Sequence, residues 1–291
     1  MHLSITHQTR YTYDREVRFQ PHLLCLRPRE NPLLTVKSFT FSFQPAARVN
    51  WMRDDFDNLP ASAHFTAAAS SLEISSGCEV ETSDTPPFDF LLRDYAVTFP
   101  FDYEPLHRFN LSIYLTPPTQ TMQELLRDWV DARMPDPPTD TVGWLVALNR
   151  LIFDSLHYGR RDEPGIQSSF TTVQRGTGTC RDYATLLIEC ARSRGIAARF
   201  VSGYVFDADD DGTGGGDMHA WVEVFLPGAG WLGLDPTHGI FCNSSYVPVA
   251  HAVVAESLNP IQGAIAAPAA TVANMTARIS VSRVREQVQC D

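Results

Sequence analysis

A glycine-rich segment at residues 176–182 holds a cysteine in a position suited to nucleophilic chemistry. Its two glycines bring a loop tightly into a predicted helix, which starts near Cys180 and ends at Gly195. The unpaired N–H groups and the dipole at a helix start favour a thiolate. The same groups can receive the oxyanion that forms when a carbonyl is attacked. The alternative is a small buried residue, which is how we interpret Cys190 on the apolar face of the same helix.

A histidine and an aspartate lie on two predicted strands downstream. His219 begins one strand, and Asp235 ends the next, after a turn at residues 227–230. Taken singly, His219 reads as a structural histidine and Asp235, before a proline, as a turn residue. The hairpin, however, brings the two together. A Cys–His pair needs an acceptor that orients the imidazole, so Cys180, His219 and Asp235 supply the three parts of a thiol-based site.

Side-chain alternation restricts how that hairpin can pair. A four-residue turn would pair Leu226 with Trp231 and place Asp235 on the face away from His219. A three-residue turn that pairs Leu226 with Gly230 places Asp235 on the correct face, and so does a five-residue turn or a single bulge. We predict one of these arrangements, with Gly228 or Gly230 at positive φ.

The elements that must position these residues fall into two groups. Residues 1–115 show short runs with period-two alternation, separated by polar turns, and this pattern predicts an antiparallel β-sandwich-like domain. Residues 116–245 form the second domain. Helices are expected over 121–133, from a cap at Thr139 onward, and over 180–195, followed by strands over 198–206, 220–226 and 231–235. Residues 246–291 form a C-terminal segment, with a late strand over 277–284 packing back on the protein. The expected fold class is therefore α+β.

Composition narrows the functional classes. The net charge is −11 in 291 residues, which argues against nucleic-acid and anionic-membrane partners. No stretch approaches the length of a membrane span. Lys37 is the single lysine, so a Walker-type motif is excluded. The N-terminus carries no secretory signal pattern, and the six cysteines are irregularly spaced. Free thiols, a cytoplasmic location and no cofactor or metal are expected.

An acidic stretch at residues 207–217 imitates the start of a calcium loop. The bidentate glutamate expected at its twelfth position is replaced by Met218. A solvated acidic loop is the alternative.

Four segments together closely resemble the core of the transglutaminase-like superfamily: GTGTCRDYA, GIAARFVSGYV, HAWVEV and GWLGLDPTHG. The N-terminal segments HLSITHQTRYTY, HLLCLRPRE and DDFDN are similar to the β domain of a bacterial transglutaminase-like or cysteine-protease-like branch. The resemblance implies a papain-like fold, with Cys180 as nucleophile, His219 as base and Asp235 as orienter. Arg181 departs from the glutamine that is common there. Three residues are candidates for the oxyanion hole or substrate pocket: Gln174, Thr179 and Trp221.

The expected function is thiol-dependent acyl transfer on a peptide, isopeptide or glutamine amide of a protein or peptide substrate. Hydrolysis is favoured because water is always present. Transamidation is an alternative, and a non-catalytic scaffold that uses the same fold is another. The sequence leaves the oligomeric state open.

Overall fold

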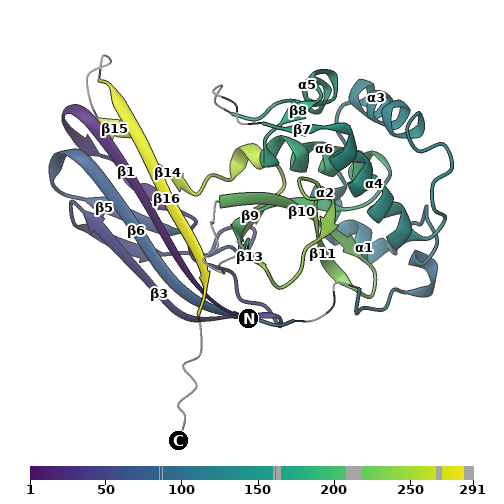
Figure 1. Ribbon diagram of the computed structural model, residues 1–291, viewed down its shortest axis with the longest axis horizontal. Helices are drawn as coiled ribbons and strands as arrows, with labels where there is room; N and C mark the ends of the chain where they lie inside the picture. Colours follow the sequence, from purple (N-terminus) through teal and green to yellow (C-terminus); the bar gives the residue numbers. More distant parts are fainter. Residues whose placement is uncertain are drawn as a thin grey trace, which may run out of the picture.

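The computed structural model is an α+β protein, with a β-sandwich on one side and a helix-and-sheet unit on the other (Figure 1). It describes residues 1–84, 86, 88–159, 161, 165–207, 218–266 and 271–284. The expected class, an antiparallel β domain followed by helices packed on an antiparallel sheet, is confirmed.

Two antiparallel sheets form the sandwich. The larger has the order β15–β1–β6–β3 with β16 also on β1, and the smaller has the order β14–β2–β5–β4. Their bounds are β1 His2–Phe19, β2 His22–Leu24, β3 Leu34–Gln44, β4 Ala47–Trp51, β5 Ala61–Phe65, β6 Ala68–Thr82, β14 Ile261–Gln262, β15 Ile265–Ala266 and β16 Ala273–Arg283. Because alternate side chains share a face, Leu72 and Ile74 of β6 meet Ala61 and Ala63 of β5 in one buried cluster.

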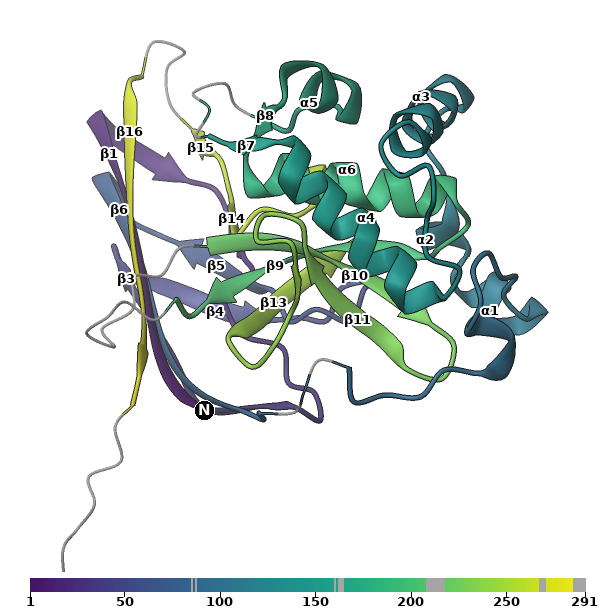
Figure 2. The ribbon, with the colours of Figure 1, turned by 45° about the vertical axis from the view of Figure 1, so that its right-hand side comes forward.

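The late strand is β16, and it returns to the start of the chain. It pairs antiparallel with β1, from Leu3 opposite Arg283 to Tyr13 opposite Ala273. Figure 2 shows it lying along β1 at the edge of the sandwich that is nearest to the core. The C-terminal segment is therefore divided: β13 (Tyr246–Ala252) belongs to the sheet of the second unit, whereas β14, β15 and β16 join the N-terminal β unit.

The second unit is a five-stranded antiparallel sheet with the order β12–β11–β10–β9–β13. Its strands are β9 Ala198–Val205, β10 Met218–Leu226, β11 Gly230–Asp235, β12 Ile240–Phe241 and β13 Tyr246–Ala252, and a short parallel pair is formed by β7 His157–Tyr158 and β8 Thr177–Gly178. The helices are α1 Pro105–Asn110, α2 Ser112–Leu115, α3 Gln120–Asp131, α4 Thr141–Ser155, α5 Ser169–Arg175 and α6 Cys180–Ser193, with 3-10 turns at Asp94–Ala96 and Ala255–Ser257. Helix α6 packs against β9 and β10 and contacts α3, α4 and α5.

The two units share one core. Leu3 and Ile5 of β1 and Val281 of β16 belong to the same buried cluster as the apolar side chains of α6 and β10. A polar contact crosses the same junction, where His7 Nδ1 lies 3.1 Å from the hydroxyl of Tyr204 on β9. Burial lowers the pKa of His7 to about 4, so this histidine is neutral and can share a hydrogen bond with the tyrosine. This packing fixes the sandwich against the sheet that carries His219.

Two sequence-based expectations about local structure were wrong. Residues 94–115 contain a 3-10 turn and helices α1 and α2, where strands were expected. These helices pack on the core unit: the His107 ring of α1 lies 5.5 Å from the Phe225 ring, and the Tyr114 ring of α2 lies 5.1 Å from the Trp231 ring, measured between centres. The cap of α4 is Asp140 rather than Thr139, since the Asp140 carboxylate accepts from the Gly143 N–H at 2.6 Å.

The β10–β11 hairpin has the pairing that the parity argument requires. Leu226 lies opposite Gly230 and Val222 lies opposite Leu234, as a three-residue turn demands. Gly228 and Gly230 both have positive φ, at 96° and 80°. The prediction is confirmed, and Asp235 follows on the same face of the sheet as His219.

Among the described residues, no helix has the length and hydropathy to cross a membrane. The cytoplasmic location and the partner expectations remain predictions.

We predict that Gly203→Ala destabilises the protein by about 1–3 kcal/mol or more. A Cβ on Gly203 would lie 2.2 Å from the Val247 carbonyl oxygen and 2.5 Å from the Trp221 ring, so β9 and β13 would have to separate. Gly159→Ala is the matched control, because a Cβ there meets nothing within 4 Å. Urea unfolding measures both. Equal midpoints for the two variants would contradict this account of the packing.

Candidate active site

Cys180 is the first residue of helix α6, and the start of this helix is held by a buried carboxylate. Thr179 is the N-cap, and the Asp182 carboxylate accepts from its N–H at 2.8 Å and from its hydroxyl at 3.0 Å. A Cβ at Gly178 would lie 2.9 Å from the Asp182 Cβ, so the loop can pass only where residue 178 is glycine. Cys180 is partly exposed and forms no disulfide in the structure.

Asp182 is fully buried and ties a second loop to the helix start. The Arg161 guanidinium donates to both of its oxygens, at 2.9 and 3.1 Å, and the Gln167 N–H donates at 2.7 Å. A buried carboxylate needs such partners, because an unpaired charge in the interior is costly. The ion pair and the cap together make the segment around Cys180 rigid.

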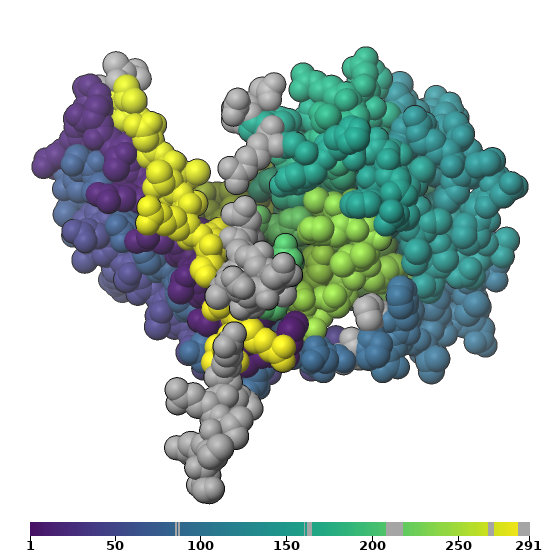
Figure 3. All heavy atoms as spheres, in the orientation of Figure 1, coloured from purple at the N-terminus to yellow at the C-terminus, as the bar shows by residue number. Residues whose placement is uncertain are grey.

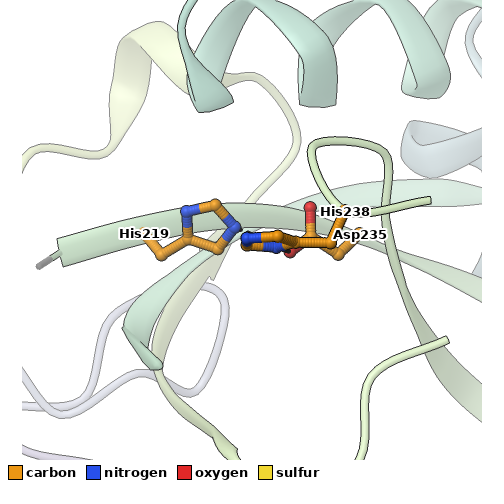
Figure 4. A group of neighbouring side chains, drawn as sticks. All are labelled: His219, Asp235 and His238. Carbon is orange, nitrogen blue, oxygen red and sulfur yellow. Dashed lines mark hydrogen bonds and ion pairs between the residues drawn. The ribbon is translucent and has the colours of Figure 1, made fainter. Parts of the chain in front are cut away.

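His219 and Asp235 are joined by a short hydrogen bond. The His219 Nε2 donates to the Asp235 Oδ2 at 2.7 Å, with the carboxylate fully buried and the imidazole side chain 12% exposed. Figure 4 shows the two side chains approaching each other from adjacent strands. Because Nε2 is committed to Asp235, Nδ1 is the nitrogen left for proton transfer. The Cys180 side chain lies within hydrogen-bonding reach of the His219 ring.

Asp235 has further donors that the sequence analysis did not find. Its Oδ2 also accepts from His238 Nδ1 at 2.6 Å and from the Tyr246 hydroxyl at 2.7 Å, while Oδ1 accepts the Thr237 N–H at 2.7 Å. His238 is visible in the motif DPTHG, three residues after Asp235. Tyr246 lies on β13, and no local pattern marks it. Four donors from three elements therefore hold one carboxylate.

These contacts fix the charges of the pair. Burial lowers the pKa of His219, but hydrogen bonds and charge interactions with Asp235 and Cys180 outweigh it and raise the pKa to about 10. Burial raises the pKa of Asp235, but the hydrogen bonds from His219, His238 and Tyr246 hold it well below its usual range. At neutral pH the pair is therefore an imidazolium bound to a carboxylate.

Among the described residues, one group could hold a metal ion by the spacing of its ligand atoms. It consists of His219, Asp235 and His238, whose ligand atoms lie within 4.8 Å of one another. The nitrogens lie 2.6 and 2.7 Å from a single carboxylate oxygen, which are distances of proton-bridged hydrogen bonds. A bound metal ion would lie about 2.0–2.2 Å from each of its ligand atoms. Ligand atoms that are only 2.6 and 2.7 Å apart leave too little space for such an ion between them. We therefore interpret the group as a hydrogen-bond network.

The three pocket candidates lie in different environments. Gln174 is exposed on α5, and the Thr179 hydroxyl donates a hydrogen bond to the Asp182 carboxylate. Trp221 is buried next to His219, with the ring centres 6.4 Å apart, and it packs edge-on against Tyr246. Trp221 is thus a support under the imidazole in this structure. The acidic stretch proposed as a calcium loop lies outside the described residues, except for Asp207.

A cavity of about 590 Å³ opens beside the imidazole. His219 and His238 border it, and Cys180 does not, so the cavity lies on the histidine side of the site. Its apolar wall is formed by Val205, Phe206, Ile240 and Ile279. Ile279 belongs to β16, and Figure 3 shows this strand along the hollow between the sandwich and the core. The C-terminal strand therefore supplies one wall of the cavity.

Two family models match the chain in separate regions. Residues 3–81 match the bacterial transglutaminase-like N-terminal region, and residues 130–236 match the transglutaminase-like superfamily. The second range contains Cys180, His219 and Asp235. The chain belongs to the transglutaminase-like superfamily, as its sequence motifs indicated.

Individual proteins are similar to all or part of this chain. An uncharacterized protein of Mycobacterium tuberculosis is 27% identical over 285 residues, covering 90% of this chain and 86% of the relative. A protein-glutamine gamma-glutamyltransferase of Pseudomonas aeruginosa is 37% identical over 71 residues, covering 22% of this chain and 10% of that protein. A crystal structure described as a candidate cysteine protease from Cytophaga hutchinsonii has a TM-score of 0.69 at 16% identity and covers 97% of both chains. This neighbour shares the papain-like fold.

We predict that His219 is still protonated at pH 8 and that Asp235→Asn lowers its pKa by about 1–3 units. The substitution removes the carboxylate that raises the pKa and leaves the burial that lowers it. Two-dimensional NMR of the imidazole nitrogens against pH measures both values. His64, exposed on β5 of the sandwich, serves as the internal control. A neutral His219 ring in the wild-type protein at pH 8 would contradict the charge assignment.

Proposed function

We propose that the protein is a thiol-dependent acyl-transfer enzyme that acts on peptide, isopeptide or glutamine amide bonds through Cys180, His219 and Asp235. The observation that carries the proposal is the 2.7 Å hydrogen bond from His219 Nε2 to the buried Asp235, with Cys180 within reach of the same ring. Membership of the superfamily supports it, since cysteine-dependent enzymes are typical members.

The chemistry follows from these positions. The Cys180 sulfur attacks the amide carbonyl, and free N–H groups at the start of α6 can receive the oxyanion. The C–N bond then breaks, His219 gives its proton to the leaving amine, and a thioester remains. Water restores the thiol in hydrolysis, with His219 accepting the proton of the attacking water.

Hydrolysis is the favoured outcome because water is always available to the thioester. Transamidation by an amine is the second candidate, and the short match to a Pseudomonas glutamyltransferase favours it. A scaffold without chemistry is the alternative of a different class. A scaffold role does not explain why an imidazolium is held beside a partly exposed thiol.

The cavity beside His219 fits the amine side of the substrate. The leaving nitrogen must be near His219 to take its proton, and the cavity borders this residue rather than Cys180. Its apolar wall suits the carbon stem of that amine. The wall includes Ile279, so we infer that the C-terminal strand contributes to substrate binding.

Iodoacetamide labelling at pH 6 tests the thiol. We expect Cys180 to react at least tenfold faster than an ordinary thiol, because an imidazolium neighbour and a helix start favour the thiolate. Cys180→Ala should abolish this fast labelling. Cys242→Ala is the control and should retain it, since burial raises the pKa of the Cys242 thiol. Ordinary reactivity of Cys180 would favour the scaffold.

A substitution on β16 tests the amine side of the cleft. Once a cleavable amide substrate is in hand, Ile279→Asp should raise KM about tenfold, because it puts a charge on the apolar wall of the cavity. Met275→Asp is the matched control, since Met275 lies on the same face of β16, is exposed and does not line the cavity. Equal KM values for both variants would show that the C-terminal strand does not contribute to substrate binding.

A further inference from the structure

The turn that follows β11 places a second histidine on the same carboxylate oxygen as His219. Asp235 Oδ2 lies 2.6 Å from His238 Nδ1 and 2.7 Å from His219 Nε2. The turn is fixed by the Gly239 N–H, which donates to the Asp235 carbonyl at 2.8 Å. Gly239 has a φ of 70°, and a Cβ there would meet the Phe153 ring at 3.0 Å. His238 is therefore held at the carboxylate by a turn that few other sequences could form.

The two histidines differ in exposure. The His219 side chain is 12% exposed, whereas that of His238 is 51% exposed. Both rings border the cavity, and their centres are 5.3 Å apart. His238 can thus exchange protons with solvent while its Nδ1 stays on Asp235. Figure 4 shows both rings at the carboxylate.

The role of His219 in the proposed function depends on a carboxylate that is held in place. The Nδ1–H of His238 contributes to this condition, because it donates to Asp235 Oδ2 at 2.6 Å, beside the bond from His219 Nε2 at 2.7 Å. A carboxylate that loses this donor is freer to turn away from the imidazole of His219.

We propose that His238 is a positioning residue whose Nδ1–H holds the Asp235 carboxylate in place for His219. The inference rests on the proposed function of Cys180, His219 and Asp235.

The test compares two substitutions of the same residue. In His238→Asn the side-chain amide nitrogen takes the place of Nδ1, so a donor to Asp235 is kept. His238→Ala removes the donor. His64→Asn is the matched control, a histidine exposed on the sandwich. The measurement is the rate of Cys180 alkylation by iodoacetamide at pH 5.5 and pH 8, followed by intact mass, together with the melting temperature of each variant.

We expect His238→Ala to react about tenfold more slowly than the wild-type protein at pH 8, and His238→Asn to match the wild type there. The melting temperatures identify any variant that has lost its fold, and the rates are compared among the folded variants.

Two results would overturn the inference: a His238→Ala rate equal to the wild-type rate, or a His238→Asn rate as low as the His238→Ala rate. If Cys180 of the wild-type protein reacts like an ordinary thiol at both pH values, the proposed function fails and this inference fails with it. If Cys180 is fast and the variants do not differ, only the role of His238 is wrong.

Discussion

The buried charge of Asp235 is the constraint on which the arrangement of the site depends. An ionised carboxylate that is shielded from water costs several kcal/mol unless donors surround it. Its four donors come from β10, from the turn after β11 and from β13. Each of these elements must therefore sit at a fixed distance from the others. The orientation of His219 is a consequence of satisfying this carboxylate.

The same principle governs the opposite wall of the site. Asp182 is buried at the start of α6, and it is paired with Arg161 and with backbone N–H groups. One buried carboxylate thus fixes the helix that carries Cys180, and the other fixes the imidazole. The shared apolar core of α6 and β10 then sets the spacing between the two. The sandwich adds to this arrangement by packing Leu3 and Val281 against the same core.

Much of this could be read from the sequence, because the strongest signals are local. Alternation and turn length determined the hairpin register that places Asp235 on the face of His219, and the glycine-rich approach marked the start of α6. Tyr246 could not be found in this way, since its hydroxyl reaches Asp235 only after β13 has crossed to the far side of β9. Ile279 reaches the cavity through pairing with the opposite end of the chain. The helices α1 and α2 have only six and four residues, too few to show a helical period, and they are held by ring contacts with β10 and β11.

The central claim is that Cys180 forms an acyl-enzyme with the help of His219 and Asp235. Intact-mass analysis of the protein after mixing with glutamine-containing peptides tests this claim most directly. The account predicts a peptide adduct, less ammonia, on Cys180. The adduct should be absent in Cys180→Ala, and in Asp235→Asn it should form more slowly by roughly 10³–10⁴-fold. An adduct of equal yield in Cys180→Ala would contradict the account, and so would the lack of any adduct in the wild-type protein.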